Sequence, residues 1–321
     1  MKIFLSCALF IILFNFTGTN KLFAQDYKNQ FLETIDNDQY INSAHDRYYT
    51  EGTLLTFSHL MDKPKNANSK LVKKIIEFQL GQQIYTPYKA NVPLESMQDR
   101  PFTGYLYAGA AINWLYSDES QLHFNAQIGT IGPASLGHYI QTQFHADFGL
   151  YSPKGWQYQL NNEPGLNLYL DYKKLLYRAD GNWFDISANP DAWLGNTFTG
   201  ASAGLIFRVG QLGKLFQSAI TNSRVGTNDG DKKYELYFFT EPQANYVAYN
   251  ATIEGGLFIK DKGPVTFGIY HYVYEQQFGL QFAAARWSAA YTVFIKSREV
   301  KSTALGDQWG SINIAYRFGK I

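Results

Sequence analysis

The sequence predicts an all-β fold, specifically a transmembrane antiparallel β-barrel of about twelve strands with a short helix in an outer-rim loop. Charged residues make up 17% of the chain, well below the roughly 25% of an average soluble domain, and Phe, Tyr and Trp raise the aromatic share to 17%. Mean hydropathy is only -0.27, and after the N-terminus no apolar run approaches the roughly 20 residues of a transmembrane helix. The apolar residues are instead dispersed and alternate with polar ones, as in a barrel wall.

The charge balance excludes one class of partner. With 28 Lys and Arg against 27 Asp and Glu, the net charge is +1. Such a chain has no field that would steer it toward a polyanion, so we expect no nucleic-acid partner.

The N-terminus predicts export. Lys2 precedes an apolar run over residues 3–16, and residues 22–25 have the character of a cleavage site, so residues 1–24 are predicted to be a secretory signal. Residues 25–321 then form a single outer-membrane barrel domain. Cys7 is the only cysteine and lies inside that signal, which excludes disulfides and cysteine chemistry from the mature chain.

Individual segments alternate with a period of two. In residues 309–318, the side chains of Ile312, Ile314, Tyr316 and Phe318 share one face, and residues 102–114 and 288–298 repeat the pattern. Several such segments exceed ten residues, whereas a soluble sandwich uses strands of about 5–6 residues and buries the apolar face. The pattern therefore favours apolar side chains toward lipid and polar side chains toward the barrel interior.

The alternation gives twelve predicted strands, an even number that fits closure of one barrel. They span residues 29–38, 50–60, 71–86, 101–116, 120–131, 156–172, 182–193, 198–208, 233–248, 265–284, 287–298 and 309–318. Residues 209–232 form a polar, glycine-containing insertion to which the sequence assigns no function.

Strand parity predicts where the polar motifs meet. With both termini in the periplasm, the connections after odd-numbered strands lie outside the cell. Five polar clusters distant in sequence then converge on the outer rim: Asn37-Asp38 and residues 45–50, 84–87, 99–101 and 132–156.

The last of these clusters contains a candidate base. His138, Gln141 and His145 follow a helix-start turn over residues 132–135, and their spacing by three and four would place them on one side of a short helix. His145, held by Gln141 or a neighbouring carboxylate, could act as a general base near neutral pH. The alternative is a solvated loop helix with no catalytic role.

The first cluster offers oxygen donors of the kind that Ca²⁺ prefers. Asn37 and Asp38 end the first predicted strand, close to the Thr50 hydroxyl across a hairpin. The alternative is an Asx turn that starts the hairpin loop. Asp46-Arg47 and Asp99-Arg100 are interpreted as rim ion pairs or loop anchors.

Taken in order, these motifs resemble the lipid A 3-O-deacylase family of outer-membrane proteins. The resemblance extends over most of the mature chain and fades in its last third. It rests on Asn37-Asp38, Asp46-Arg47-Tyr48-Tyr49-Thr50-Glu51-Gly52, Ile84-Tyr85-Thr86-Pro87, Asp99-Arg100-Pro101-Phe102-Thr103-Gly104, Ile131-Gly132-Pro133-Ala134-Ser135-Leu136-Gly137, Gln141-x-x-x-His145, Gly155-Trp156-x-x-Gln159-Leu160-x-Asn162-Glu163-Pro164 and Gly195-Asn196.

The resemblance implies a twelve-stranded barrel that hydrolyses the 3-position acyl ester of lipid A in the outer leaflet. It implies that His145 is the base and Gln141 its neighbour on the helix, with Asn37 and Thr50 beside the reacting ester and Asp38 and Asn37 implicated in binding Ca²⁺. Lipid A or lipopolysaccharide would be the substrate, outer-membrane lipids the surroundings, and a monomer the working form.

Two positions depart from the family pattern, and two other functions remain open. Val92 stands where well-known members carry a lysine, with Lys89 nearby, and Tyr151 stands where they carry an acid. One alternative is a channel or adhesin on the same scaffold. The other is a secreted soluble β-sandwich that binds glycans.

Overall fold

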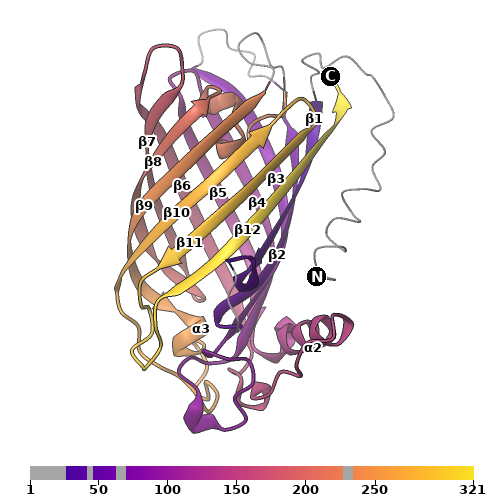
Figure 1. Ribbon diagram of the computed structural model, residues 1–321, viewed down its shortest axis with the longest axis vertical. Coiled ribbons are helices and arrows are strands. Elements are labelled where there is room, and N and C mark those ends of the chain that lie inside the picture. Colours follow the sequence, from indigo (N-terminus) through magenta and orange to yellow (C-terminus); the bar gives the residue numbers. More distant parts are fainter. Residues whose placement is uncertain (1–26, 42–45, 63–69, 227–233) are drawn as a thin grey trace.

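The computed structural model is a closed barrel in which every strand pairs antiparallel with its neighbours and the last strand pairs with the first (Figure 1). The structure describes residues 27–41, 46–62, 70–226 and 234–321. The predicted signal, residues 1–24, and His45 lie outside these ranges. Closure rules out the soluble β-sandwich.

The twelve strands run in sequence order around the wall. They are β1 (Tyr27–Asn37), β2 (Tyr48–Leu60), β3 (Leu71–Thr86), β4 (Thr103–Tyr116), β5 (Ser120–Ile131), β6 (Glu163–Arg178), β7 (Phe184–Gly195), β8 (Phe198–Gln211), β9 (Glu235–Asn250), β10 (Tyr272–Ala283), β11 (Trp287–Lys296) and β12 (Asp307–Lys320). The helices are α2 (Gly137–Asp147) and α3 (Ala251–Glu254), with short 3₁₀ turns η1 (Asp38–Ile41), η2 (Glu95–Met97), η3 (Pro133–Ser135), η4 (Trp156–Tyr158), η5 (Leu215–Gln217) and η6 (Ala219–Thr221).

Two predicted strands are displaced in the structure. The segment 156–172 was predicted as one strand, but Trp156–Tyr158 form a 3₁₀ turn and β6 begins at Glu163. Gly155 precedes this turn with a φ of 114°, which favours glycine. The Trp156 ring is buried, with its centroid 5.1 Å from that of Phe102, instead of facing lipid. The segment 265–284 is likewise strand only from Tyr272, because the preceding residues belong to an outer loop.

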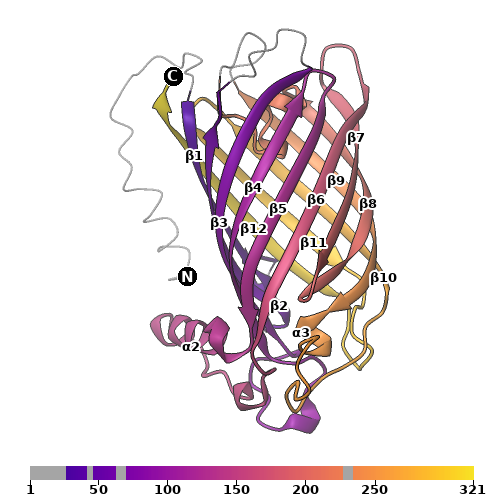
Figure 2. The same cartoon turned by 180° about the vertical axis from the view of Figure 1, so that it is seen from behind.

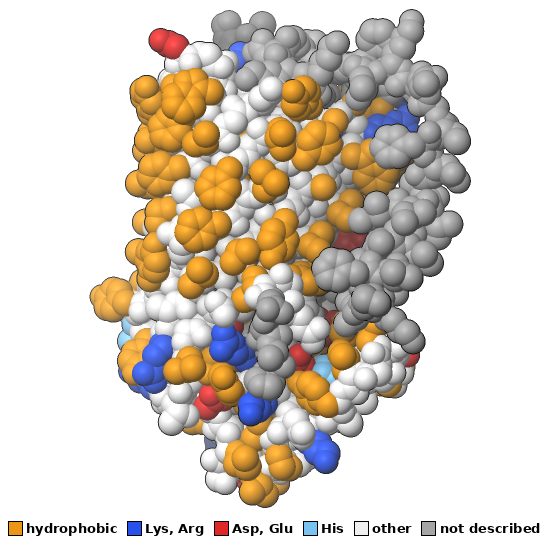
Figure 3. All heavy atoms as spheres, viewed as in Figure 1, with side chains coloured by type: hydrophobic (Ala, Val, Ile, Leu, Met, Phe, Trp, Pro, Cys, Tyr) orange, Lys and Arg blue, Asp and Glu red, His pale blue; other side chains and the backbone are white. Residues whose placement is uncertain are grey.

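The wall has the predicted orientation of its side chains, with apolar residues outside. On β6, Leu166 is 62% exposed while the adjacent Asn167 is fully buried toward the lumen. Ile128 on β5 is 68% exposed, and Asn125 and Gln127 on the same strand are buried. Hydrophobic side chains cover the wall between its two ends, and charged side chains gather at the end that carries α2 and α3 (Figure 3).

The two ends of the barrel differ. The C-terminus and the beginning of β1 lie at one end, while α2 and α3 lie at the other, with α2 projecting beyond the wall (Figures 1 and 2). This arrangement matches the parity argument, since η1, α2 and α3 follow β1, β5 and β9. In the described residues, no helix is both long and apolar enough to cross a membrane.

Cysteine labelling tests this orientation. Gln143 is exposed on α2, and Asp180 is exposed in the turn between β6 and β7 at the opposite end. We expect a membrane-impermeant thiol reagent to label Gln143→Cys on intact cells and Asp180→Cys only after the outer membrane is opened. The reverse pattern would contradict the orientation.

Candidate active site

The helix α2 is held against the outer end of the wall by a close approach of two glycines. A Cβ atom added to Gly137 would lie 3.1 Å from the Gly104 Cα atom and 3.1 Å from the Trp156 ring. Any larger residue would push the helix away from β4. Gly137, Gln141 and His145 are the buried residues of α2, so the helix turns polar side chains inward.

Trp156 fixes the middle of α2. Its ring packs on Phe102 and stacks on His138 with centroids 5.5 Å apart. Its Nε1 donates a hydrogen bond of 2.8 Å to Gln141 Oε1, which leaves the Gln141 amide nitrogen directed toward Asp46. His138 is exposed, so the predicted trio divides into one surface histidine and two buried residues.

Asp46 is the centre of the buried polar group around His145. Its Oδ2 lies 2.9 Å from His145 Nε2 and accepts hydrogen bonds from the Tyr151 hydroxyl at 2.8 Å and from Gln141 Nε2 at 3.3 Å. His145 Nδ1 lies 2.6 Å from the Tyr151 carbonyl oxygen. A carbonyl can only accept, so Nδ1 carries a proton and Nε2 is the nitrogen available for proton transfer.

The electrostatics couple these two groups. Burial alone would lower the pKa of His145, but the hydrogen bonds to Asp46 and to the Tyr151 carbonyl, together with the Asp46 charge, hold that pKa above its usual value. Burial alone would raise the pKa of Asp46, but the hydrogen bonds from His145 and Tyr151 hold it below its usual value. The pair therefore favours an imidazolium beside a carboxylate.

Asp38 forms a second buried group next to the first. Its Oδ2 accepts hydrogen bonds from the Arg47 backbone N–H at 2.7 Å and from the Thr50 hydroxyl at 3.0 Å. Because Arg47 follows Asp46, one short segment joins the Asp38 group to the His145 group. Asn37 Oδ1 accepts from the Gln39 backbone N–H at 2.8 Å, which is the contact of an Asx turn.

The oxygens around Asp38 fit a hard cation. No donor among the described residues reaches the buried Oδ1 of Asp38, and burial together with the Asp46 charge raises the pKa of Asp38 to about 8. An unpartnered oxygen and an unfavourable negative charge are both relieved by a cation. The described part of the chain contains no group of three or more His, Cys, Asp or Glu arranged around a metal, so carbonyl, hydroxyl or substrate oxygens would complete the shell.

The comparisons with known proteins agree with this architecture. The profile of a family described as outer membrane protein LpxR matches residues 3–318. The chain belongs to the LpxR family. It is therefore an outer-membrane protein, as the motifs predicted.

The solved structure of one LpxR protein has the same fold. LpxR from Salmonella typhimurium superposes with a TM-score of 0.72 at 20% identity, covering 90% of this chain and 100% of that one. The β domain of the Bordetella autotransporter Brka and the COG4313 outer membrane channel from Pseudomonas putida F1 give TM-scores of 0.43 and 0.46 at 8% and 9% identity, covering 92% and 94% of this chain and all of theirs. No curated protein sequence matches the chain significantly.

Several residues of the LpxR family resemblance hold the outer loops. The Glu163 carboxylate accepts from the backbone N–H groups of Leu257 and Phe258 at 2.8 Å and from Asn196 Nδ2 at 2.9 Å. Asn162 Oδ1 accepts from the Ala134 N–H at 2.7 Å. These side chains join the segment before α2, the turn after β7 and the loop after α3 to the beginning of β6.

The two aspartate-arginine motifs have different roles. Asp99 and Arg100 are loop anchors as predicted, because Asp99 accepts from the Tyr88 N–H and the Tyr48 hydroxyl, and the buried Arg100 pairs with Glu299 and donates to Thr252. The Asp46 carboxylate pairs with His145 at 2.9 Å, and the Arg47 backbone N–H donates to Asp38, so this motif belongs to the candidate site and is more than a loop anchor.

The two positions that depart from the LpxR family pattern lie in different surroundings. Val92 is buried, while Lys89 Nζ and Arg47 Cζ lie 6.0 and 5.8 Å from the ring centroid of Tyr88. Tyr151 carries no charge, but its hydroxyl and its carbonyl contact Asp46 and His145.

Proposed function

We propose that this protein is a lipid A deacylase of the outer leaflet and that it hydrolyses an acyl ester at the 3-position. The observation that carries the proposal is the buried pair of His145 and Asp46 at the outer end of a barrel of the LpxR family. His145 lies on α2 and Asp46 in the connection between β1 and β2, and both elements belong to the end of the barrel that carries α2 and α3.

The proposed reaction is attack of water on the ester carbonyl. The reactive form is the neutral ring that exists above the raised pKa of His145. The Tyr151 carbonyl keeps the remaining ring proton on Nδ1, so Nε2 carries the lone pair and accepts the proton from water when its contact with Asp46 opens. The hydroxide oxygen forms the new bond to carbon, and the sugar oxygen leaves with a proton returned from the imidazolium. Asp46 stabilises the imidazolium between these steps.

Ca²⁺, when bound beside Asp38, would supply positive charge for the oxyanion of the tetrahedral intermediate. Asp38 would hold the ion, and Thr50 orients the Asp38 carboxylate through its hydroxyl. We propose that Asn37 contributes by shaping the turn that presents Asp38, in addition to the oxygen donor predicted from the sequence.

Mass spectrometry of lipid A tests the function. Cells that produce the protein should carry lipid A lighter by one acyl chain than cells without it. A non-catalytic channel or adhesin, which is the alternative function, predicts identical lipid A in both strains.

Asp46→Asn tests the proton chemistry. Removing the Asp46 charge should lower the pKa of His145, so the acidic limb of the activity profile should move to lower pH. The rate at the optimum should also fall because the imidazolium loses its partner. If the acidic limb of the Asp46→Asn pH–activity profile stayed at the wild-type pH, the group whose titration sets that limb would not be His145 paired with Asp46.

A further inference from the structure

The segment that follows β8 folds into the barrel instead of extending from it. Residues 212–226, here called the plug, contain η5 and η6 and lie inside the wall near the end that holds the C-terminus (Figure 1). The sequence assigned no function to this region.

The plug spans the lumen, since it contacts strands on opposite sides of the wall. Lys73 Nζ on β3 donates to the carbonyls of Ser223 and Val225 at 3.0 and 2.8 Å. Asn113 on β4 and Gln121 on β5 donate to the Thr221 carbonyl.

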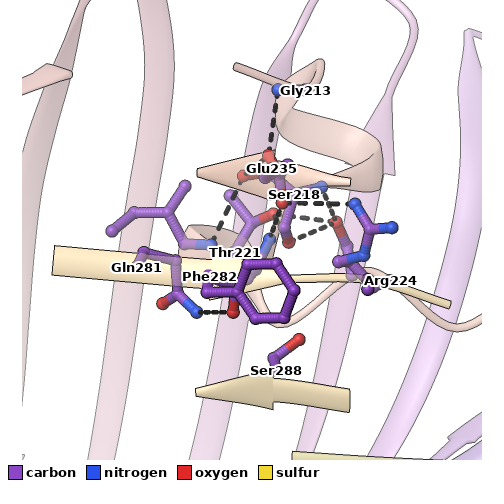
Figure 4. Close-up of polar contacts among 12 residues, drawn as sticks. Gly213, Ser218, Thr221, Arg224, Glu235, Gln281, Phe282 and Ser288 are labelled. Carbon is purple, nitrogen blue, oxygen red and sulfur yellow. Dashed lines mark hydrogen bonds and ion pairs between the residues drawn. The ribbon is translucent and has the colours of Figure 1, made fainter. Parts of the chain in front are cut away.

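The other side of the plug is held by β9, and the end of the plug is held by β1. Glu235 on β9 accepts from the N–H groups of Gly213 and Ala219, both at 2.9 Å, and from the Ser218 hydroxyl at 2.7 Å, and it pairs with Arg224 (Figure 4). The Gly226 N–H donates to the Tyr27 carbonyl on β1 at 2.8 Å.

Buried charges of the wall depend on these contacts. Arg208 is fully buried and donates to the Ser218 hydroxyl in addition to Asp185. Without the plug, Glu235 and Lys73 would lose the plug partners named above, and a buried charge that loses hydrogen-bond partners is costly. Val225 and Phe216 also pack against Ile75 and Leu115 of the wall. The plug is thus part of the folded resting state.

The barrel needs such a segment to be closed. About eight strands enclose an interior that side chains alone can fill, whereas larger barrels leave an aqueous channel unless a plug occupies it. Here residues 219–222 of the plug line a cavity of about 310 Å³ together with polar wall residues such as His123 and Asp171.

We propose that residues 212–226 are a periplasmic plug that seals the barrel to solutes, so that the protein can act on lipid at its outer rim without opening a pore in the outer membrane. The proposal goes beyond the deacylase function and does not depend on it, because the plug and the His145 group lie at opposite ends.

Liposome swelling and bilayer conductance of the full-length protein test the plug. The wild-type protein should give no steady conductance, and a variant with residues 213–225 replaced by Gly-Ser should admit small sugars at least about tenfold faster, because the lumen of a twelve-stranded barrel exceeds what side chains fill. The plugless variant should keep its ester hydrolysis, which separates this result from failure of the proposed function.

A matched pair of point variants covers the case in which the plugless protein does not fold. Lys73→Met removes the donor to two plug carbonyls and should give intermittent openings. Lys74→Met should conduct no more than wild type, since neighbouring strand residues point to opposite faces. Steady conductance of the wild-type protein would overturn the proposal. So would a plugless variant that is folded, as shown by heat-modifiable migration, but leaves the liposomes impermeable to small sugars.

Discussion

Replacement of His145 by glutamine should reduce lipid A hydrolysis by about 10²–10⁴-fold, the usual contribution of a general base. Glutamine retains an amide that can donate toward Asp46, but it cannot take a proton from water at neutral pH. The measurement is fatty-acid release from lipid A in detergent micelles by the purified variant. Heat-modifiable migration on gels shows whether the barrel is intact.

His138→Gln is the matched control. His138 lies on the same helix but is exposed, and its ring stacks on Trp156 with centroids 5.5 Å apart. Its replacement should change the rate only severalfold, because the pair of His145 and Asp46 stays in place. If a folded His145→Gln protein hydrolysed lipid A at the wild-type rate, another group would have to be the base.

The strands of the wall could be predicted from the sequence because every strand of a barrel alternates lipid-facing and lumen-facing side chains. In β4, the inward Tyr105, Tyr107 and Asn113 are buried, and the outward Ala108 and Ala110 are exposed, as the period of two predicts. The rule fails where the chain leaves the membrane. Tryptophan is a residue type common in strands. Trp156 is nevertheless buried under α2, because the residues at this end form a small hydrophobic core of their own.

The sequence predicted only part of the candidate site, because it indicates local contacts and not contacts between distant segments. The spacing on α2 predicted that Gln141 and His145 share a face, since helical geometry is local. The partner of His145 is Asp46, which lies 99 residues earlier in the chain. Because Arg47 is next to Asp46, the sequence favoured an ion pair between these two neighbours. Tyr151 was also not predicted as a site residue. One of its two contacts comes from the backbone carbonyl, which any residue type would provide.

Asp38→Asn should weaken Ca²⁺ binding by at least about a hundredfold, since one charge about 4 Å from a cation is worth roughly 4 kcal/mol at an effective dielectric constant near 20. Asparagine keeps an oxygen that can accept from Arg47 and Thr50, so the turn should survive. Activity should fall at low Ca²⁺ and recover as Ca²⁺ is raised. Wild-type enzyme should lose activity in a chelator and recover with Ca²⁺ better than with Mg²⁺, whose octahedral demand is stricter.

The pH dependence of Ca²⁺ binding separates a metal site from a turn. Because the pKa of Asp38 is about 8 without a cation, Ca²⁺ must displace a proton below that pH, and its affinity should rise as the pH increases toward 8. Calorimetry should show this rise for the wild-type protein and not for Asp38→Asn. Asp99→Asn makes the same chemical change at a loop anchor and should leave Ca²⁺ affinity unchanged. Full hydrolysis in excess chelator would remove Ca²⁺ from the mechanism and leave Asp38 as a residue of the hairpin turn, with His145 still the base.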